Sequence, residues 1–140
     1  MPKTIIQKIL FRNTTPKALF DIYINAKKHT AATGAMAKIN SKEGSNFTAH
    51  GGYISGRNLQ IVKNRQLVQS WRAQGWDKEI ADSILLINFE PKGMDTVLHL
   101  VHANIPDKHV KGIDHGWHEH YWEPWKKFLA GKPVPKSPVM

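Results

Sequence analysis

The sequence predicts an α+β fold in which a curved antiparallel sheet of about six or seven strands wraps around a long C-terminal helix, with two short helices after the first strand. Aromatic residues recur at helical spacing over residues 113–129, whereas short apolar segments alternate with turn residues between about 35 and 103. One face of such a sheet must be covered, and the aromatic helix is the only large apolar cover that the chain offers.

The N-terminal part predicts one strand and two helices. The loose alternation over Thr4–Phe11 favours a first strand. Thr15 is suited to cap a helix whose first turn contains Pro16, because proline needs no hydrogen-bond acceptor there. A second short helix is expected over Ala26–Ala32, and Gly34 ends it.

The middle of the chain predicts a meander of hairpins. Turn residues such as Gly51-Gly52 and Lys63-Asn64-Arg65 separate short apolar runs. We expect strands over Met36–Ile39 (a weak one), Phe47–His50, Tyr53–Val62, Gln66–Arg72, Ser83–Glu90 and Thr96–Ala103.

The C-terminal helix contains three of the five tryptophans. One of its faces is formed by Ile113, Trp117, Tyr121, Trp125 and Phe128, and Trp122 and Leu129 widen this face. Each large aromatic side chain contributes roughly 2–3 kcal/mol when it is fully buried, so this face must lie on something large and apolar. The polar residues of the helix are expected on its other side.

The ends of this helix and one interruption can also be predicted. Asp107 or Asp114 is a plausible N-cap, and Gly131 terminates the helix before Pro133. Pro124 removes a hydrogen bond and crowds the preceding turn, so we expect a kink near residues 120–123.

Composition limits the class of protein. The 140 residues suit one domain over residues 1–131, followed by a flexible tail over 132–140. The chain has no cysteine, no signal peptide and no apolar run long enough for a bilayer, so we expect a cytoplasmic protein without membrane insertion. The net charge of +9 is scattered over the sequence, without a nucleic-acid motif, and therefore indicates a solvated basic surface.

The chain resembles the SRPBCC (START-like, helix-grip) superfamily, and within it the proteins related to the C-terminal domain of the activator of the heat-shock protein 90 ATPase. The resemblance covers about residues 3–130. It depends on Phe47, Gly52, Gly56, Leu67–Arg72, Trp76, Thr96–His102, Pro106, Gly116-Trp117 and Tyr121. It implies a helix-grip fold with a cavity between sheet and helix, and no shared catalytic motif. The first strand begins close to Met1, so we expect no counterpart of the activator's separate N-terminal domain.

A ligand site is predicted at this cavity. Its candidate residues are Tyr53, Trp71, Trp76, Trp117 and Tyr121, which suit an apolar, partly aromatic ligand. The alternative is that these rings simply fill the core. Because neighbouring strand residues point to opposite faces, Arg72 is expected to face solvent or a partner at the sheet edge when Trp71 faces the helix.

Metal and catalytic sites are not favoured. His115 and His118 lie one helical turn apart, but no carboxylate set accompanies them, and His99 and His102 are expected on opposite sheet faces. The possible acid–base residues of the helix are Asp114, Glu119, Glu123 and the histidines, and most of them are expected to project away from any cavity. We therefore expect no metal, no cofactor and no catalytic residues.

Three functions remain open at this point. The first is non-catalytic binding of a small hydrophobic molecule, either lipid-like or aromatic. The second is a co-chaperone that contacts a heat-shock protein 90 type chaperone and modulates its ATPase, which the resemblance and the basic surface suggest. The third is a minor enzyme of the cyclase or hydrolase type.

Overall fold

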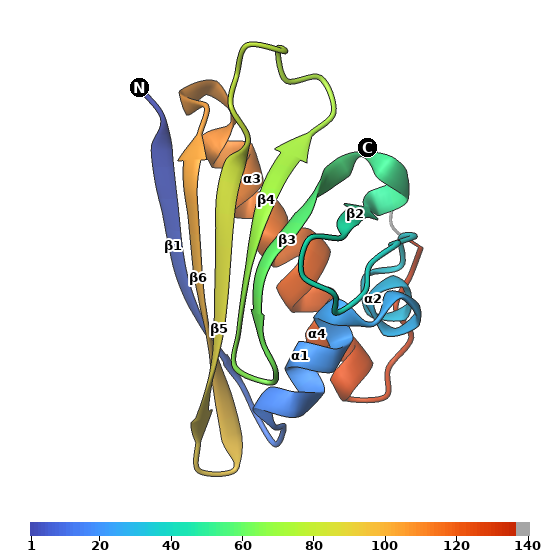
Figure 1. Cartoon of the computed structure of the whole chain (residues 1–140). Helices are drawn as coiled ribbons and strands as arrows, with labels where there is room; N and C mark the ends of the chain where they lie inside the picture. The colour runs from blue at the N-terminus through green and yellow to red at the C-terminus, as the bar shows by residue number, and fades with distance from the viewer. Residues whose placement is uncertain (137–140) are drawn as a thin grey trace.

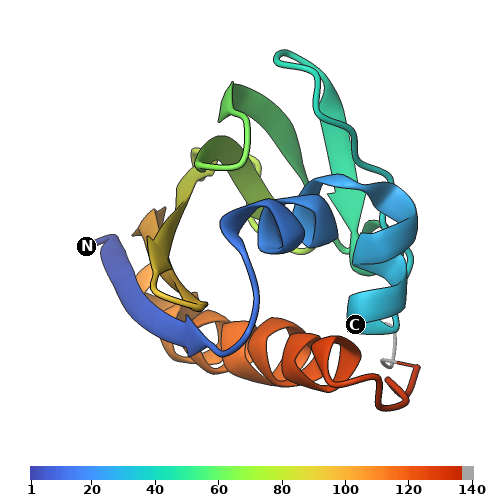
Figure 2. The same cartoon turned by 90° about the horizontal axis from the view of Figure 1, so that it is seen from below.

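The computed structural model describes residues 1–136 and has one antiparallel sheet on which a long C-terminal helix lies (Figure 1). The six strands are ordered β1-β6-β5-β4-β3-β2. Their bounds are Lys3–Phe11 (β1), Asn46–Ala49 (β2), Ile54–Val62 (β3), Gln66–Ala73 (β4), Ser83–Lys92 (β5) and Asp95–Ile105 (β6). The sheet curves around the helices, as the view in Figure 2 shows. The predicted fold class is confirmed.

Two short helices follow the first strand, as predicted. Helix α1 spans Pro16–Ile24, and its N-cap Thr15 accepts a hydrogen bond from the backbone N–H of Ala18. Helix α2 spans Ala26–Thr33 and ends at Gly34, which has a left-handed φ of 78°. Helix α1 packs on β5, and α2 packs on the end of the C-terminal helix.

The predicted weak strand over Met36–Ile39 is wrong. Only one bridge joins Lys38 to Thr48 of β2, through two backbone hydrogen bonds of 2.9 Å. Ala35, Ala37 and Ile39 are buried, so the apolar alternation is real, but β2 has only four residues and offers no longer partner.

The C-terminal helix consists of a short 3₁₀ turn, η2 (Asp107–His109), followed by α3 (Val110–Trp117), η3 (His118–Trp122) and α4 (Glu123–Leu129). Neither predicted aspartate caps it: Pro106 and His109 precede η2 and α3, while Asp114 lies inside α3. The helix ends before Gly131, whose φ is 71°, as expected.

The irregularity expected from Pro124 takes the form of a π-helical turn. This turn, η3, lies just before Pro124, which occupies the first turn of α4. A π turn inserts one residue into the helix. As a result Tyr121 and Trp122 are both buried, and the ring of Trp122 stacks on that of Trp117 with centroids 5.4 Å apart.

The helix is fixed to the sheet by apolar and polar contacts with β1. Trp122 and Trp125 are fully buried, and both rings pack on Phe11 at 6.2 and 5.9 Å. The side chain of Gln7 accepts a hydrogen bond from Nε1 of Trp122 (2.7 Å) and donates one to Oδ1 of Asp114 (2.8 Å). The helix therefore lies on its own sheet, as the sequence predicted.

The predicted tail is only partly described. Residues 132–136 form no helix or strand, and residues 137–140 lie outside the described residues. Within the described chain, no helix combines the length and the apolar character needed to cross a membrane.

Gly56 of β3 should be intolerant of any side chain. A Cβ at this position would collide with the carbonyl oxygen of Ser70 and lie 2.7 Å from the ring of Phe47. We expect Gly56→Ala to lower the free energy of unfolding by about 3 kcal/mol, because the obstacle is backbone of the neighbouring strand. Urea denaturation monitored by tryptophan fluorescence measures the change.

The matched control is Gly112→Ala in α3, where a Cβ meets nothing within 4 Å. That substitution should raise the free energy of unfolding by about 0.5–1 kcal/mol, since alanine is the better helix former. Equal stability of Gly56→Ala and the unmodified protein would contradict the packing described here.

Candidate functional site

A cavity of about 300 Å³ lies between the sheet and the first half of the C-terminal helix. Its walls come from β3 and β4, from the turn η1 (His50–Gly52) and the loop after β4, and from η2, α3 and η3. All five candidate ligand residues line it: Tyr53, Trp71, Trp76, Trp117 and Tyr121. The structure thus brings together every residue that the sequence predicted for the site.

The aromatic rings form a continuous wall. The ring of Tyr121 lies 4.7 Å from that of Trp117, which lies 6.4 Å from Trp71. Trp71 in turn lies 5.9 Å from Trp76, and the imidazole of His109 stacks on Trp76 at 5.8 Å. Trp71, Trp117 and Tyr121 are nearly fully buried, so the same rings belong to the core and to the cavity wall. A cavity lined by these rings and a core filled by them were alternatives in the sequence, and the structure is compatible with both.

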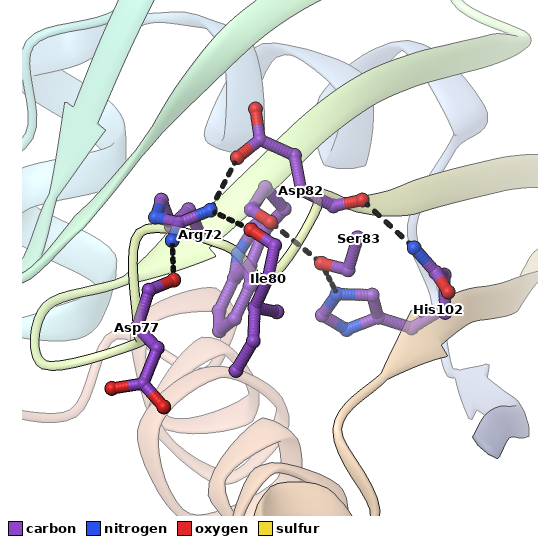
Figure 3. Close-up of polar contacts among 8 residues, drawn as sticks. Arg72, Asp77, Ile80, Asp82, Ser83 and His102 are labelled. Atoms are coloured by element: carbon purple, nitrogen blue, oxygen red, sulfur yellow. Dashed lines mark hydrogen bonds and ion pairs between the residues drawn. The ribbon is translucent and has the colours of Figure 1, made fainter. Parts of the chain in front are cut away.

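A buried chain of hydrogen bonds links the indole of Trp117 to the backbone of Trp71. Nε1 of Trp117 donates to Nδ1 of His102 at 3.1 Å. Because indole N–H is only a donor, the proton of His102 is on Nε2, which donates to Oγ of Ser83 at 2.8 Å. The Ser83 hydroxyl then donates to the carbonyl oxygen of Trp71 at 2.6 Å (Figure 3).

This chain excludes one catalytic interpretation. Ser83 and His102 are the residue types of a nucleophile and its base, but a base must accept the hydroxyl proton. Here the imidazole donates to the hydroxyl, and both side chains are fully buried. The pair positions the cavity wall and has no access to a substrate.

Arg72 holds the loop that carries Trp76. On the sheet face opposite Trp71, its guanidinium donates to the backbone carbonyl oxygens of Ile80 (2.6 Å) and Asp77, and it pairs with the carboxylate of Asp82 at 3.0 Å (Figure 3). The guanidinium carbon also lies 5.8 Å from the centroid of Trp76. The opposite orientation of Arg72 was predicted, but its bonds to the loop that carries Trp76 were not.

Hydrogen bonds connect Tyr121 to the two short helices, α1 and α2. Its hydroxyl bonds to Nε2 of His29 at 3.0 Å, while Nδ1 of His29 bonds to the carbonyl oxygen of Tyr23 at 2.7 Å. Burial raises the pKa of Tyr121 and lowers the pKa of His29 to about 4, so both groups are neutral at pH 7. This ring network connects α1 and α2 to the cavity.

Sequence reasoning missed several cavity residues. His50 was expected at the end of a strand, but it lies in η1 with a φ of 51° and is 2% exposed. Gly112 and Gly116 lie one turn apart on α3 and both line the cavity. Their spacing in an otherwise aromatic face was the available signal, because a missing side chain on that face leaves room.

One expectation about the polar residues is wrong. His115, Glu119 and His120 line the cavity, although the polar residues of the helix were expected to project away from it. Glu119 and His120 lie in the π turn, which changes the helical period between Trp117 and Trp122. His115 precedes this turn in the regular helix α3, next to Gly116 at the edge of the cavity.

The histidines form no metal site among residues 1–136, where no three potential ligand side chains meet. His115 lies 3.1 Å from Glu119 in an i, i+4 pair, and His99 lies 3.0 Å from Glu90 on the exposed sheet face. His102 is buried on the opposite face, as the sequence predicted. The arrangement is therefore that of an aromatic cavity with a polar rim.

The fold and this cavity define a helix-grip domain. A family model described as "Activator of Hsp90 ATPase homolog 1-like protein" matches residues 13–130. The chain therefore belongs to the family of activator of Hsp90 ATPase homologue 1-like proteins.

Relatives and solved structures agree with this assignment. The activator of 90 kDa heat shock protein ATPase homolog of Dictyostelium discoideum is 29% identical over 104 residues, which are 74% of this chain and 27% of that protein. The human homolog 1 is 26% identical over 110 residues, covering 79% of this chain and 32% of the relative. The chain thus spans about a third or less of the length of these relatives.

The fold is shared with smaller proteins. An HSP90 activator from Plasmodium falciparum has a TM-score of 0.80 at 24% identity, covering 93% of this chain and 97% of that one. CalU16 from Micromonospora echinospora has a TM-score of 0.80 at 22% identity, covering 96% and 78%. These likenesses show that the fold is the same.

The buried histidines predict how stability depends on pH. Burial lowers the pKa of His29 and His50 to about 4 and that of His102 to about 3, whereas the unfolded chain has the ordinary value of 6.5. Protons therefore bind the unfolded state first as the pH falls below 6.5, and the folded state loses stability until about pH 4. We expect the free energy of unfolding to fall by roughly 3 kcal/mol between pH 7 and pH 5.5, about 1 kcal/mol for each histidine.

Chemical denaturation at a series of pH values measures this dependence. In His102→Phe the slope between pH 7 and pH 5.5 should fall by about a third, whatever the absolute stability of the variant. A free energy of unfolding that stays constant over this range would contradict the buried, neutral state of the three rings.

Proposed function

We propose that the cavity binds a small, flat, largely apolar molecule without chemical conversion. The observation that carries this proposal is the wall of rings formed by Tyr121, Trp117, Trp71 and Trp76 along a cavity of about 300 Å³. That volume is at the lower end of the range of small-molecule sites. Aromatic walls favour flat aromatic or conjugated molecules, because stacked or edge-to-face ring pairs add attraction beyond the area they bury.

The local structure supports the same proposal. Buried hydrogen bonds fix the side chains of Trp117 and Tyr121 and the backbone of Trp71, whose ring is packed in the core. Trp76 is positioned by the loop that Arg72 holds. A wall that is fixed before binding loses little side-chain entropy when a ligand arrives. In addition, each helix glycine at 112 and 116 costs about 0.5–1 kcal/mol relative to alanine, and both open the cavity.

Blocking the cavity at Gly112 tests this function. The neutral probe 2-naphthamide is titrated into the protein, and quenching of tryptophan fluorescence or heat of binding is measured. We expect Gly112→Phe to weaken binding at least about tenfold, or about 1.4 kcal/mol, because a phenyl ring enters the open space beside this glycine.

The control Gly112→Ala adds one methyl group to the same open space and should bind the probe as the unmodified protein does. Extraction of the purified protein with organic solvent, followed by mass spectrometry, should release a flat apolar compound from Gly112→Ala and not from Gly112→Phe. An unchanged affinity of Gly112→Phe for 2-naphthamide would contradict the proposed binding in this cavity.

A second function is favoured by the family to which the chain belongs. We infer that the domain also contacts a 90 kDa heat-shock chaperone, the partner named for its relatives. The net charge of +9 suits an acidic partner and would speed association at low salt. The cytoplasmic location expected from the sequence belongs to this same proposal.

ATP turnover of such a chaperone, measured with and without this protein, tests the contact. We expect turnover to rise at micromolar protein and the increase to shrink at high salt, since salt screens exposed charges beyond about 10 Å at 0.1 M. Gly112→Phe should stimulate as well as the unmodified protein, because its cavity, and not its charged surface, is changed. If the ATP turnover of the chaperone does not rise at low salt, this second function is wrong.

A further inference from the structure

We propose that the ligand of the cavity is an aromatic acid with two polar ends: an acidic group bound beside Lys108 and His109, and a neutral hydrogen-bonding group such as a hydroxyl bound by His50. This inference rests on the proposed binding function and specifies the ligand's chemistry. It follows from the polar atoms at the two ends of the aromatic wall.

Two unpartnered ring nitrogens mark these ends. Within the described chain, four buried side-chain polar atoms have no hydrogen-bond partner, and two of them, Nδ1 of His50 and Nε2 of His109, belong to cavity residues. A buried polar atom without a partner costs about 1–3 kcal/mol. Both atoms belong to residues that line the same cavity, so a ligand bound there is placed to satisfy them.

The two histidines lie at opposite ends of the wall. The ring of His50 lies 5.3 Å from that of Tyr121 and 5.6 Å from that of His120, while His109 stacks on Trp76. Residues 109 and 120 are separated by eleven positions, or roughly 16 Å along a helix. A molecule that lies along Tyr121, Trp117, Trp71 and Trp76 therefore presents its two ends to different histidines.

Charge distinguishes the two ends. Lys108 lines the cavity next to His109 and is solvent-exposed, so it can receive an anion at the rim without burying it completely. Glu119, the carboxylate that lines the cavity, lies on η3 and is paired with His115 at 3.1 Å. The η2 end is therefore the cationic end of the cavity.

The His50 end is suited to a neutral group. His50 is 2% exposed, and its neighbours are His29, His120 and the ring of Tyr121. Burial, with His29 and His120 nearby, lowers the pKa of His50 to about 4, so an anion at this end would find a neutral ring. A neutral imidazole can donate to or accept from a hydroxyl group.

The test uses four naphthalenes of the same shape. They are 2-naphthoic acid, 2-naphthamide and the 6-hydroxy derivative of each, whose substituents lie at opposite ends of one flat ring system. In the unmodified protein we expect the acid to bind at least about tenfold more tightly than the amide, and the 6-hydroxyl group to add about threefold or more.

Variants at each end separate the two contacts. Lys108→Met combined with His109→Phe should abolish the preference for acid over amide and leave the effect of the 6-hydroxyl group. His50→Phe should abolish the effect of the 6-hydroxyl group and leave the preference for the acid. Because His50 has a positive φ, His50→Asn is a second variant that tolerates this backbone and has a shorter side chain, and it should behave in the same way.

The outcomes distinguish failure of this inference from failure of the proposed binding function. If none of the four probes binds the unmodified protein, the binding function and the inference both fail. If the amide binds as tightly as the acid, or the preference for the acid survives in the Lys108–His109 double variant, the binding function stands and the two-ended acid is wrong.

Discussion

The burial of one aromatic helix face against the sheet is the interaction on which the rest of the structure depends. Trp122 and Trp125 are fully buried and pack on Phe11 of the first strand, and Gln7 of the same strand bonds both to Trp122 and to Asp114. Each fully buried large side chain contributes roughly 2–3 kcal/mol. The first strand and the last helix are thereby joined, so the two ends of the chain fold as one unit.

The cavity arises from the same helix, because its apolar face is not uniform. The half around Trp122 and Trp125 fills the space between α1, α2 and β1, whereas the half around Gly112 and Gly116 leaves space beside the sheet. The π turn η3 separates the two halves and directs both Tyr121 and Trp122 inward. One helix thus supplies the core at one end and a lined cavity at the other, and the buried polar chains of His102 and His29 fix the rings at the boundary.

Most of the fold, but less of the candidate site, can be predicted from the sequence. Periodicity predicts the C-terminal helix, the hairpins and the inward orientation of Trp71, because apolar spacing directly records which side chains are buried. The single bridge at Lys38 could not be predicted, since it depends on the length of the neighbouring strand β2. The position of His50 was also missed: it depends on a positive φ in a turn, and a histidine there leaves no pattern of its own. The rim residues Glu119 and His120 lie in the π turn, which changes the helical period that the prediction assumed.

The residues that carry the family resemblance have structural reasons to be present together. Gly56 lets β3 pass close to Ser70 and Phe47, Arg72 fixes the loop of Trp76, and Trp117 and Tyr121 form the wall that these residues complete. These residues are buried or bonded within the fold, so their presence together is explained by the cavity that they build. The proposed chaperone contact would depend instead on exposed, charged residues. A change in the cavity lining and a change in surface charge should therefore affect the two proposed functions separately.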